Sequence, residues 1–422
     1  MRRVALISEH ASPLAMLGGV DSGGQNVYVG QLAQLLSRRG YDVDVFTRRD
    51  RADLPLVAPF QGARVIHVPA GPAERVEKEK LLPHMDEFTR FVLRFAERQN
   101  RDYDIVHANF FMSAQVAMSV KRALGIPFVV TFHALGRVRR KYQRDADTFP
   151  DARLEIEERA IAAADRVIAE CPQDREDLIQ LYGAQRARLR TIPCGFDPLE
   201  FAPRPRPQAR RTLGLDPHEP IILQLGRMVP RKGVDNVIRG LARLRRVHGV
   251  AARLLIVGGE SRAPDPSLTP EIGRLQRLAH EENVAPAVTF VGSRGRSELR
   301  DYYCAADVFV TTPWYEPFGI TPIEAMACGT PVIGAAVGGI KSTVRDGETG
   351  FLVPPSDPDA LAERLAALFD DATLRARLGH NAVRRAQNQF TWQSVAGKIS
   401  SLYEEILATA PSPHLATAVA QV

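Results

Sequence analysis

Residues 221–233 read Ile-Ile-Leu-Gln-Leu-Gly-Arg-Met-Val-Pro-Arg-Lys-Gly. The apolar run 221–225 predicts a buried strand, and Gly233 predicts the entry into a helix. Arg227 and Lys232 lie in the loop between these two elements. In parallel α/β domains, ligands bind in the loops that follow the carboxyl ends of the strands. The stretch therefore predicts an α/β domain with a cationic ligand-binding loop after its first strand.

Further strands alternate with helical periodicity on both sides of this stretch, which predicts parallel βαβ units. Helices are predicted at 86–98, 113–124, 358–369 and 392–407. Strands are predicted at 4–7, 43–46, 65–68, 105–108, 128–132, 166–169, 189–192, 254–257, 288–291, 308–311, 332–333 and 351–353.

The proline-rich stretch 201–207 divides this series and predicts a linker. We therefore expect two doubly wound, Rossmann-like domains, residues 1–200 and 201–390, facing an inter-domain cleft. A C-terminal helix at 391–410 is expected to pack back towards the N-terminal domain, and residues 411–422 are expected to form a flexible tail.

Composition excludes several classes of protein. The 422 residues include 55 Lys and Arg against 49 Asp and Glu, a net charge of +6, which is too small for the dense basic stripe of a nucleic-acid binder. The four cysteines show no C-x-x-C spacing, which argues against a zinc site or a disulfide framework. No apolar run approaches the roughly 18 residues of a membrane span. A soluble cytoplasmic enzyme is expected.

The glycine-rich segment 18–26, Gly-Gly-Val-Asp-Ser-Gly-Gly-Gln-Asn, follows the first predicted strand and opens a helix. Main-chain amides of Gly23 and Gly24 at a helix N-terminus would favour an anion. The alternative is a flexible loop without a ligand. A dinucleotide fingerprint is not supported, because the G-x-G-x-x-G spacing is absent.

Two further motifs lie at predicted strand ends. Arg227 and Lys232 are suited to hold a diphosphate, although solvated surface charge is the alternative for either one alone. Residues 316–324, Glu-Pro-Phe-Gly-Ile-Thr-Pro-Ile-Glu, follow the strand 308–311. A helix beginning there would present the amides of 318–321 to a phosphate and turn Glu316 and Glu324 towards the cleft. The rival interpretation is the carboxylate pair of a glycosidase, but a hydrolase has no need of cations.

His133 is expected to end the strand 128–132 at the cleft, where a packed or capping histidine is the alternative interpretation. The basic run 137–144 is either a solvated face or a surface that attracts an anionic acceptor. Two D-x-D sequences, at 42–44 and 357–359, resemble metal sites, but the first lies within a strand and the second is an N-cap. We expect no metal and no other cofactor.

Together these motifs resemble the retaining glycosyltransferases of family 4, which have the two-domain GT-B fold. The resemblance covers almost the whole chain and is carried most strongly by the E-x7-E motif at Glu316 and Glu324, together with Arg227 and Lys232. The stretches 21–29 and 131–136 are similar to sucrose synthases, sucrose-phosphate synthases and the mycothiol-pathway N-acetylglucosaminyltransferase. Residues 192–197, Ile-Pro-Cys-Gly-Phe-Asp, match the family's segment before the linker, with Cys194 where Asn is common.

The resemblance implies an acceptor-binding N-terminal domain and a nucleotide-sugar-binding C-terminal domain. Arg227 and Lys232 would hold the donor diphosphate, Glu316 the transferred sugar and Glu324 the ribose. His133 would contact the sugar or the reacting centre, so the catalytic set is His133, Glu316, Arg227 and Lys232. The remaining donor-binding residues would be Gly23, Gly24, Gly292, Arg294, Phe318, Gly319, Ile320 and Thr321.

The acceptor is less well defined. The expected acceptor-binding residues are Gln25, Asn26, Lys78, Phe110, Arg137 and Arg153. Phe110 and Ala134 stand where the mycothiol enzyme has Tyr and Thr on the acceptor phosphate, so an inositol phosphate acceptor is in doubt. Lys341 stands where relatives often have Glu.

The expected reaction moves a hexose, glucose or N-acetylglucosamine in type, from a UDP-sugar to a hydroxyl of a sugar, sugar phosphate or glycan. The alternatives are another GT-B enzyme, namely a phosphorylase or an epimerase, and a silent nucleotide-sugar-binding scaffold. We expect no nucleic-acid partner. Weak association with an anionic membrane stays open, as does the oligomeric state.

Overall fold

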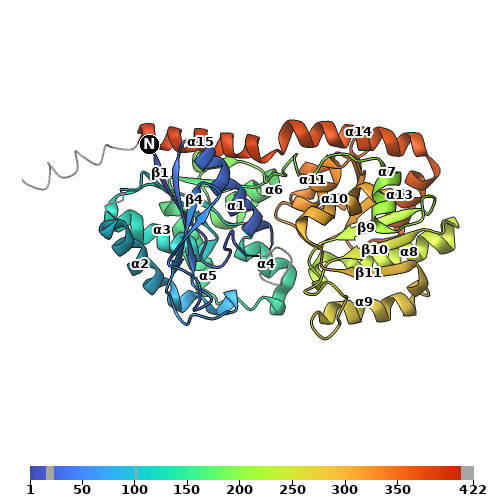
Figure 1. Cartoon of the computed structure of the whole chain (residues 1–422), viewed down its shortest axis with the longest axis horizontal. Coiled ribbons are helices and arrows are strands. Elements are labelled where there is room, and N and C mark those ends of the chain that lie inside the picture. Colours follow the sequence, from blue (N-terminus) through green and yellow to red (C-terminus); the bar gives the residue numbers. More distant parts are fainter. Residues whose placement is uncertain (16–22, 100–101, 410–422) are drawn as a thin grey trace, which may run out of the picture. The chain divides into compact units, whose positions relative to one another are not determined.

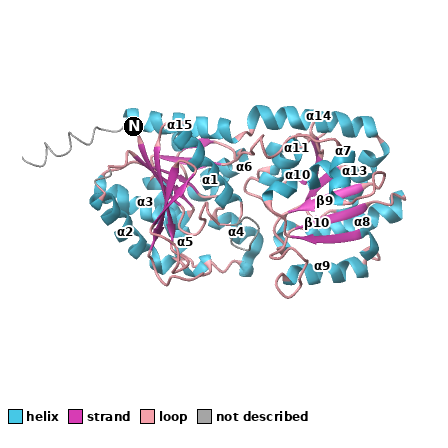
Figure 2. Cartoon of the chain, in the orientation of Figure 1, coloured by secondary structure: helices cyan, strands magenta, loops and turns pink. Residues whose placement is uncertain are grey.

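The computed structural model describes residues 1–15, 23–99 and 102–409 (Figure 1). The glycine-loop residues 18–22 and the expected tail 411–422 lie outside these ranges. The chain forms two compact units. Unit 1 contains Met1–Ala15, Gln25–Pro193 and the C-terminal helix from Trp392, and most of unit 2 is Cys194–Thr391. In each unit a sheet lies among helices (Figure 2).

Unit 1 contains an eight-stranded sheet in the order β3-β4-β2-β1-β5-β6-β7-β8. Its strands are β1 (Arg3–Ile7), β2 (Asp42–Arg48), β3 (Val57–Phe60), β4 (Ala63–Val68), β5 (Ile105–Asn109), β6 (Phe128–Thr131), β7 (Arg166–Ala169) and β8 (Leu189–Thr191). Its helices are α1 (Gly24–Arg38), α2 (Met85–Arg98), α3 (Phe111–Leu124), α4 (Gly136–Gln143), α5 (Ala152–Ala163), α6 (Pro172–Tyr182) and α15 (Trp392–Thr409). The central strands are buried along their length, as expected for a sheet covered on both faces.

The edge strand β3 is the one element of this sheet that the sequence does not predict. It pairs antiparallel with β4, whereas the other pairs are parallel. Its residues alternate between exposed and half-buried, and Pro59 interrupts the apolar pattern. Proline is tolerated at a sheet edge, where its missing N–H faces solvent.

Helix α15 packs within unit 1. The hydroxyl of Tyr403 lies 2.7 Å from Nδ1 of His107, whose ring is fully buried in β5. At the surface of the same helix, Glu405 pairs with Arg166 and Arg190. Burial lowers the pKa of His107 to about 3, so this histidine is a neutral core residue at physiological pH.

Unit 2 contains a six-stranded parallel sheet in the order β11-β10-β9-β12-β13-β14. Its strands are β9 (Ile221–Leu225), β10 (Arg253–Val257), β11 (Val288–Gly292), β12 (Val308–Thr311), β13 (Val332–Ala335) and β14 (Gly350–Val353). Its helices are α7 (Arg206–Leu213), α8 (Val234–His248), α9 (Pro270–Glu281), α10 (Arg296–Ala305), α11 (Ile320–Ala327), α12 (Ile340–Thr343), α13 (Pro358–Asp370) and α14 (Ala372–Gln389).

The linker predicted at 201–207 ends earlier than expected, because α7 begins at Arg206. Pro205 is its N-cap residue, and Pro207 lies in its first turn. Proline fits there because the first helical amides have no intrahelical acceptor. Proline count alone therefore overestimates the length of the linker.

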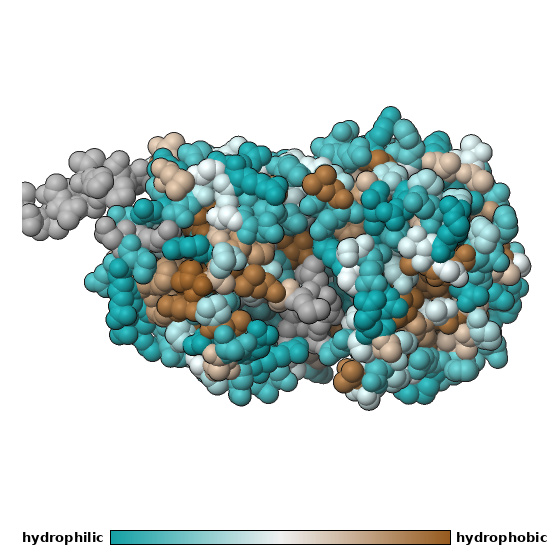
Figure 3. Space-filling model, viewed as in Figure 1, coloured by the Kyte–Doolittle hydropathy of each residue, from teal (hydrophilic) through white to brown (hydrophobic). Residues whose placement is uncertain are grey.

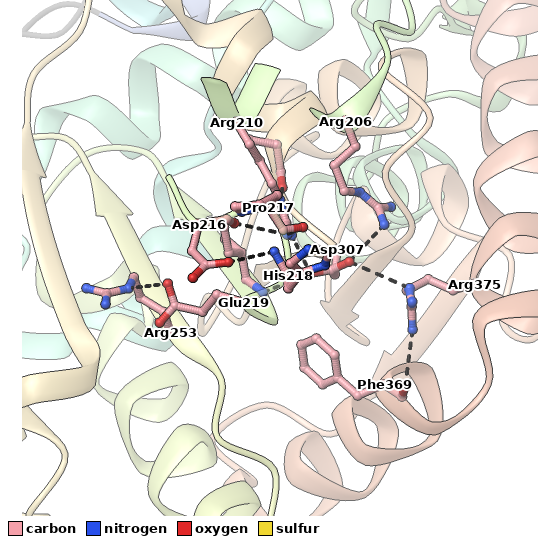
Figure 4. Close-up of polar contacts among 12 residues, drawn as sticks. Arg206, Arg210, Asp216, Pro217, His218, Glu219, Arg253, Asp307, Phe369 and Arg375 are labelled. Carbon is pink, nitrogen blue, oxygen red and sulfur yellow. Dashed lines mark hydrogen bonds and ion pairs between the residues drawn. The ribbon is translucent and has the colours of Figure 1, made fainter. Parts of the chain in front are cut away.

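Asp307 lies at the amino end of β12 and organises that end of the unit 2 sheet (Figure 4). Its Oδ1 lies 2.9 Å from Nη1 of Arg206, and its Oδ2 accepts from Nη2 of Arg210 at 2.8 Å. Arg375 of α14 approaches to 3.8 Å, and the first amide of β9, Ile221 N–H, donates to Oδ2 at 2.8 Å. One buried carboxylate thus joins α7, β9, β12 and α14.

Hydrophilic residues cover most of the face drawn in Figure 3, with hydrophobic residues between them. The exposed large hydrophobic residues come from widely separated segments, as is ordinary for a folded protein. Among the described residues they are Met1, Leu14, Leu56, Val57, Leu124, Tyr142, Leu199, Val247 and Leu268. Across 1–15, 23–99 and 102–409, no helix has the length and apolar character needed to cross a bilayer.

Candidate active site

Each sheet has a topological switch point, where neighbouring strands connect in opposite directions. In unit 1 it lies between β1 and β5, and in unit 2 between β9 and β12. Ligands of doubly wound sheets bind at the carboxyl ends of the strands at such points. Several of the predicted site residues follow these strands: Gln25 and Asn26 come after β1, Phe110 after β5, Arg227 and Lys232 after β9, and Glu316 after β12.

The cationic loop after β9 is held in place by one glycine. Gly233 has φ +65°, and a Cβ there would lie 1.9 Å from the carbonyl oxygen of Thr312. The Thr312 hydroxyl in turn donates to the Gly233 carbonyl at 2.9 Å. Only glycine permits both this left-handed backbone and the close approach. The contact fixes Lys232, the preceding residue, against the loop that follows β12.

Lys232 forms an ion pair with Glu316, and Arg231 lies 4.0 Å from the same carboxylate oxygen. Burial would raise the pKa of Glu316, but the charges of Lys232 and Arg231 outweigh it and lower the pKa. Burial, with help from Arg231 and Arg227, lowers the pKa of Lys232 to about 8. A compact positive site around one carboxylate therefore exists at the unit 2 switch point, and an added anion would relieve its excess charge.

The main chain after Glu316 is also tightly packed. Gly338 has φ +45°, and a Cβ there would lie 1.8 Å from the Glu316 carbonyl oxygen. That carbonyl accepts from the Gly339 amide at 3.0 Å. Gly319 is the N-cap residue of α11, and the helix begins at Ile320. The predicted phosphate seat at 318–321 is therefore the actual N-terminus of a helix.

Glu324 lies inside α11 and is almost fully buried. Its Oε1 accepts from Nη1 of Arg296 at 3.0 Å, and its Oε2 accepts from the hydroxyl of Tyr303 at 2.9 Å. Burial raises the pKa of Glu324 despite these two donors. Arg296 also pairs with Glu200 and stacks on Phe201, whose ring centroid lies 4.9 Å from its guanidinium carbon. Helix α10 thus fixes the carboxylate that the family resemblance places on the donor ribose.

Tyr303→Phe is expected to weaken donor binding about tenfold, because it removes one donor from a buried carboxylate. The measurement is the Kd of UDP by titration calorimetry, with the melting temperature as the control for folding. An unchanged Kd would show that Glu324 keeps its position without Tyr303.

Gly292 ends β11 and Arg294 follows it, where the sequence places the base pocket. A Cβ on Gly292 would lie 2.2 Å from the Arg262 carbonyl oxygen, so this loop packs closely on residues 261–262. Arg294 donates to that same carbonyl at 2.8 Å and to the Tyr302 hydroxyl at 3.1 Å. Its guanidinium therefore shapes the loop.

In unit 1, His133 lies beyond the end of its strand. Strand β6 ends at Thr131, and His133 has φ +59°, so the prediction that it ends the strand is wrong by two residues. Its Nδ1 lies 2.9 Å from Glu170 Oε1, and its Nε2 lies 3.0 Å from Asn109 Oδ1. The left-handed turn brings the ring towards the carboxyl end of β5.

Two other predicted residues, Gln25 and Phe110, lie at the same strand end, and a third, Asn26, contacts the loop that follows β1. Gln25 donates to the Ser8 hydroxyl and to the Asn109 carbonyl, both at 3.2 Å. Asn26 donates to the Ser12 carbonyl at 2.9 Å. Phe110, which follows β5, has φ +88° and is buried. The structure therefore brings Gln25, Phe110 and His133 together around Asn109.

Arg153 is enclosed instead of open to solvent. Its guanidinium carbon lies 4.6–5.0 Å from the ring centroids of Phe110, Phe111 and Phe149. It pairs with the buried Glu157 at 2.8 Å and donates to the Ala134 carbonyl at 2.5 Å. These contacts hold the chain that follows His133, and they occupy most of a side chain expected to bind the acceptor.

The two remaining predicted acceptor residues, Lys78 and Arg137, lie on short helices, Arg137 in α4. Lys78 is in the 3-10 helix Lys78–Lys80, with its ammonium 4.0 Å from Glu79. In the basic run, three arginines pair with carboxylates: Arg137 with Glu158, Arg139 with Asp147 and Arg140 with Asp151. This pairing reduces the positive charge available to an anionic acceptor.

Five residues of these clusters are not among the sequence-based predictions: Arg231, Arg296, Tyr303, Asn109 and Glu170. Arg231 carries a signal, since it lies between the two predicted cations. The other four make contacts with residues that are distant in the sequence, such as the contact of Arg296 with Glu324. No local sequence pattern predicts such contacts.

The two D-x-D sequences are structural. Asp44 is buried and pairs with Arg64 at 2.7 Å, and Asp357 caps α13 by accepting from the Ala360 amide at 2.9 Å. Within the described residues, no group of three or more His, Cys, Asp or Glu side chains is placed to hold a metal ion.

Donor affinity is expected to fall above pH 8. A lysine attracts a diphosphate only while it is a cation, and Lys232, with a pKa of about 8, loses its proton as the pH rises through that value. The Kd of UDP, measured from pH 6.5 to 9.5, should therefore rise. In Lys232→Arg, which stays charged, the rise should be much smaller. A pH-independent Kd in the unmodified protein would contradict this role.

Two family models match the chain. Glycosyltransferase Family 4 matches residues 22–199, and Glycosyl transferases group 1 matches residues 205–385. The D-inositol 3-phosphate glycosyltransferase of Acidothermus cellulolyticus is 39% identical, over 99% of this chain and 94% of that protein. That of Actinosynnema mirum is also 39% identical, over 96% of this chain and 97% of the relative.

Solved structures agree with this assignment. Sucrose-phosphate synthase from Thermosynechococcus elongatus superposes with a TM-score of 0.88 at 35% identity, over 97% of this chain and 100% of that one. The Anabaena protein HepE, solved with UDP and glucose, gives a TM-score of 0.75 at 20% identity over 96% of this chain and 100% of its own, a likeness of fold. The chain therefore belongs to the family 4 glycosyltransferases with the GT-B fold, enzymes that move a sugar to a hydroxyl acceptor.

Proposed function

We propose that the chain is a retaining hexosyltransferase that uses a UDP-sugar as donor and a hydroxyl of a sugar or polyol, free or phosphorylated, as acceptor. The observation that carries the proposal is the cluster of Lys232, Arg231 and Glu316 at the unit 2 switch point. A departing nucleoside diphosphate gains negative charge in the transition state, and preorganised cations stabilise that charge.

The parts of the donor map onto separate groups of this site. Lys232 and Arg227 would hold the diphosphate, with the α11 amides after Phe318 as additional donors. Glu324, fixed by Arg296 and Tyr303, would accept from the ribose hydroxyls. When a diphosphate binds, Lys232 would form its ion pair with the diphosphate instead of with Glu316. The Glu316 carboxylate would then be available to bind the transferred sugar. UDP is favoured because HepE was solved with UDP-glucose and with UDP.

A panel of UDP-, GDP- and ADP-sugars, tested by thermal shift and calorimetry, examines the donor. We expect a rise in melting temperature with UDP-glucose or UDP-N-acetylglucosamine. Binding of GDP- or ADP-sugars alone would overturn the choice of base, and binding of none of the panel would contradict the donor site.

The acceptor screen should pair each phosphorylated compound with its free form: fructose 6-phosphate with fructose, and D-inositol 3-phosphate with inositol. The pairing tests whether a phosphate gains a partner at Arg153, whose guanidinium is enclosed by three aromatic rings. Proton NMR of the product then gives the anomeric configuration. An inverted linkage would rule out the retaining mechanism.

A further inference from the structure

Two cysteines that are distant in the sequence lie together in unit 2. Cys304 is in the last turn of α10, and Cys328 directly follows α11, 24 residues later. The Cys304 sulfur lies 3.9 Å from the Cys328 carbonyl oxygen, and the two thiols hydrogen-bond to each other. Each residue keeps 4% of its surface exposed, and both thiols are free. The fold thus builds a dithiol pair that the cysteine spacing does not predict.

The pair is connected directly to the residues that hold Glu324. Tyr303, the neighbour of Cys304, donates through its hydroxyl to Oε2 of Glu324 at 2.9 Å. The Cys328 amide donates to the Glu324 carbonyl at 3.1 Å. The Thr330 hydroxyl donates to the Tyr303 carbonyl at 2.6 Å, so the chain after α11 also contacts α10. A displacement of either cysteine would therefore move a partner of Glu324.

The two thiols differ in reactivity. The hydrogen bond from the Cys328 thiol lowers the pKa of Cys304, whereas burial raises the pKa of Cys328 well above its usual value. The thiolate is the nucleophile of cysteine chemistry, so Cys304 is the thiol expected to react first. The small exposed fraction of both residues favours a small oxidant. Cys171 of unit 1 is a contrast, because burial raises its pKa to about 12.

We propose that Cys304 and Cys328 form a reversible redox site, which hydrogen peroxide oxidises to a disulfide and a dithiol reduces again. The Cys304 thiolate attacks one peroxide oxygen, the O–O bond breaks, and a sulfenic acid and water form. The Cys328 sulfur then attacks the Cys304 sulfur, the S–O bond breaks, and the S–S bond forms with release of a second water. The two thiols lose two electrons, which reduce the peroxide, and both thiol protons leave in the water.

The disulfide is expected to weaken donor binding, a consequence that rests on the proposed function. The sulfur atoms of a disulfide are about 2.05 Å apart, much closer than two hydrogen-bonded thiols, so the carboxyl ends of α10 and α11 must shift. Protein interiors are close-packed, and such a shift displaces the side chains around it. We expect the Kd of UDP to rise about tenfold, the effect also expected of Tyr303→Phe.

The test compares the reduced protein with the same protein after treatment with hydrogen peroxide. Free thiols are alkylated, and a protease that cleaves after glutamate then separates the two cysteines at Glu324. Without reductant, we expect the peptides that contain Cys304 and Cys328 to stay joined, with the mass loss of two hydrogen atoms. Calorimetry should give the tenfold higher Kd of UDP, and dithiothreitol should reverse both changes.

Cys304→Ser and Cys328→Ser should each abolish the rise in Kd. Cys171→Ser is the matched control, because serine is a good N-cap residue for α6 and should leave the response to peroxide unchanged. Separate, alkylated peptides after peroxide treatment would overturn the inference, and joined peptides with an unchanged Kd would contradict the effect on donor binding. The peptide map uses the unmodified protein, so it decides even if a variant does not fold. If the reduced protein binds no UDP, the proposed function fails, while the map still shows whether the disulfide forms.

Discussion

Lys232→Ala is expected to reduce turnover by about 10²- to 10³-fold at saturating donor, the range found when one preorganised donor to a developing negative charge is removed. The loss should appear in kcat as well as KM, since the diphosphate carries more charge in the transition state than in the bound donor. The measurement is release of UDP from UDP-glucose in the presence of acceptor.

Folding should survive this change. Arg231 remains 4.0 Å from Glu316, so the buried carboxylate keeps a cationic neighbour, and the melting temperature should change by only a few degrees. Lys80→Ala is the matched control, because it removes an exposed ion pair of 2.7 Å with Glu77. Wild-type kcat in Lys232→Ala would show that the loop cations have another role.

Much of the fold is predictable from the sequence for a physical reason. Central strands of a parallel sheet are buried on both faces, so they appear as short apolar runs that are visible without tertiary information. The same logic places Arg227, Lys232 and Glu316, because a residue that directly follows such a run must lie at the ligand-binding end of the sheet. The GT-B architecture and the family assignment are confirmed by the matching family models and structures.

What the sequence does not predict depends on contacts between distant segments. Glu324 is a recognisable motif residue, but the donors that hold it, Arg296 and Tyr303, come from another helix. Arg153 illustrates the opposite error. The sequence predicts that this basic residue of the expected acceptor domain binds ligand, yet three aromatic rings and Glu157 enclose it. Only the packing of the folded chain shows which charged side chains are available to bind a ligand.

Asp307→Asn is expected to lower the free energy of unfolding by about 3–5 kcal/mol, the cost of removing one partner from a buried ion pair. Asp307 neutralises Arg206 and Arg210, and asparagine leaves both charges without a counter-ion at the amino end of the sheet. It also places an amide donor near groups that themselves donate, including the Ile221 amide. Urea unfolding followed by tryptophan fluorescence measures the change.

Because of where Asp307 lies, its substitution is expected to change the stability of the protein without changing its affinity for UDP. Asp307 lies at the amino ends of β9 and β12, whereas Arg227, Arg231 and Lys232 follow the carboxyl end of β9. The folded variant should therefore bind UDP with unchanged Kd below the unfolding transition. Asp359→Asn is the matched control, since its pair with Arg243 is also close, at 2.9 Å, but 70% of the Asp359 side chain is exposed. Exposed pairs contribute about 0–1 kcal/mol. Equal losses in the two variants would mean that burial around Asp307 does not set the energy of this cluster.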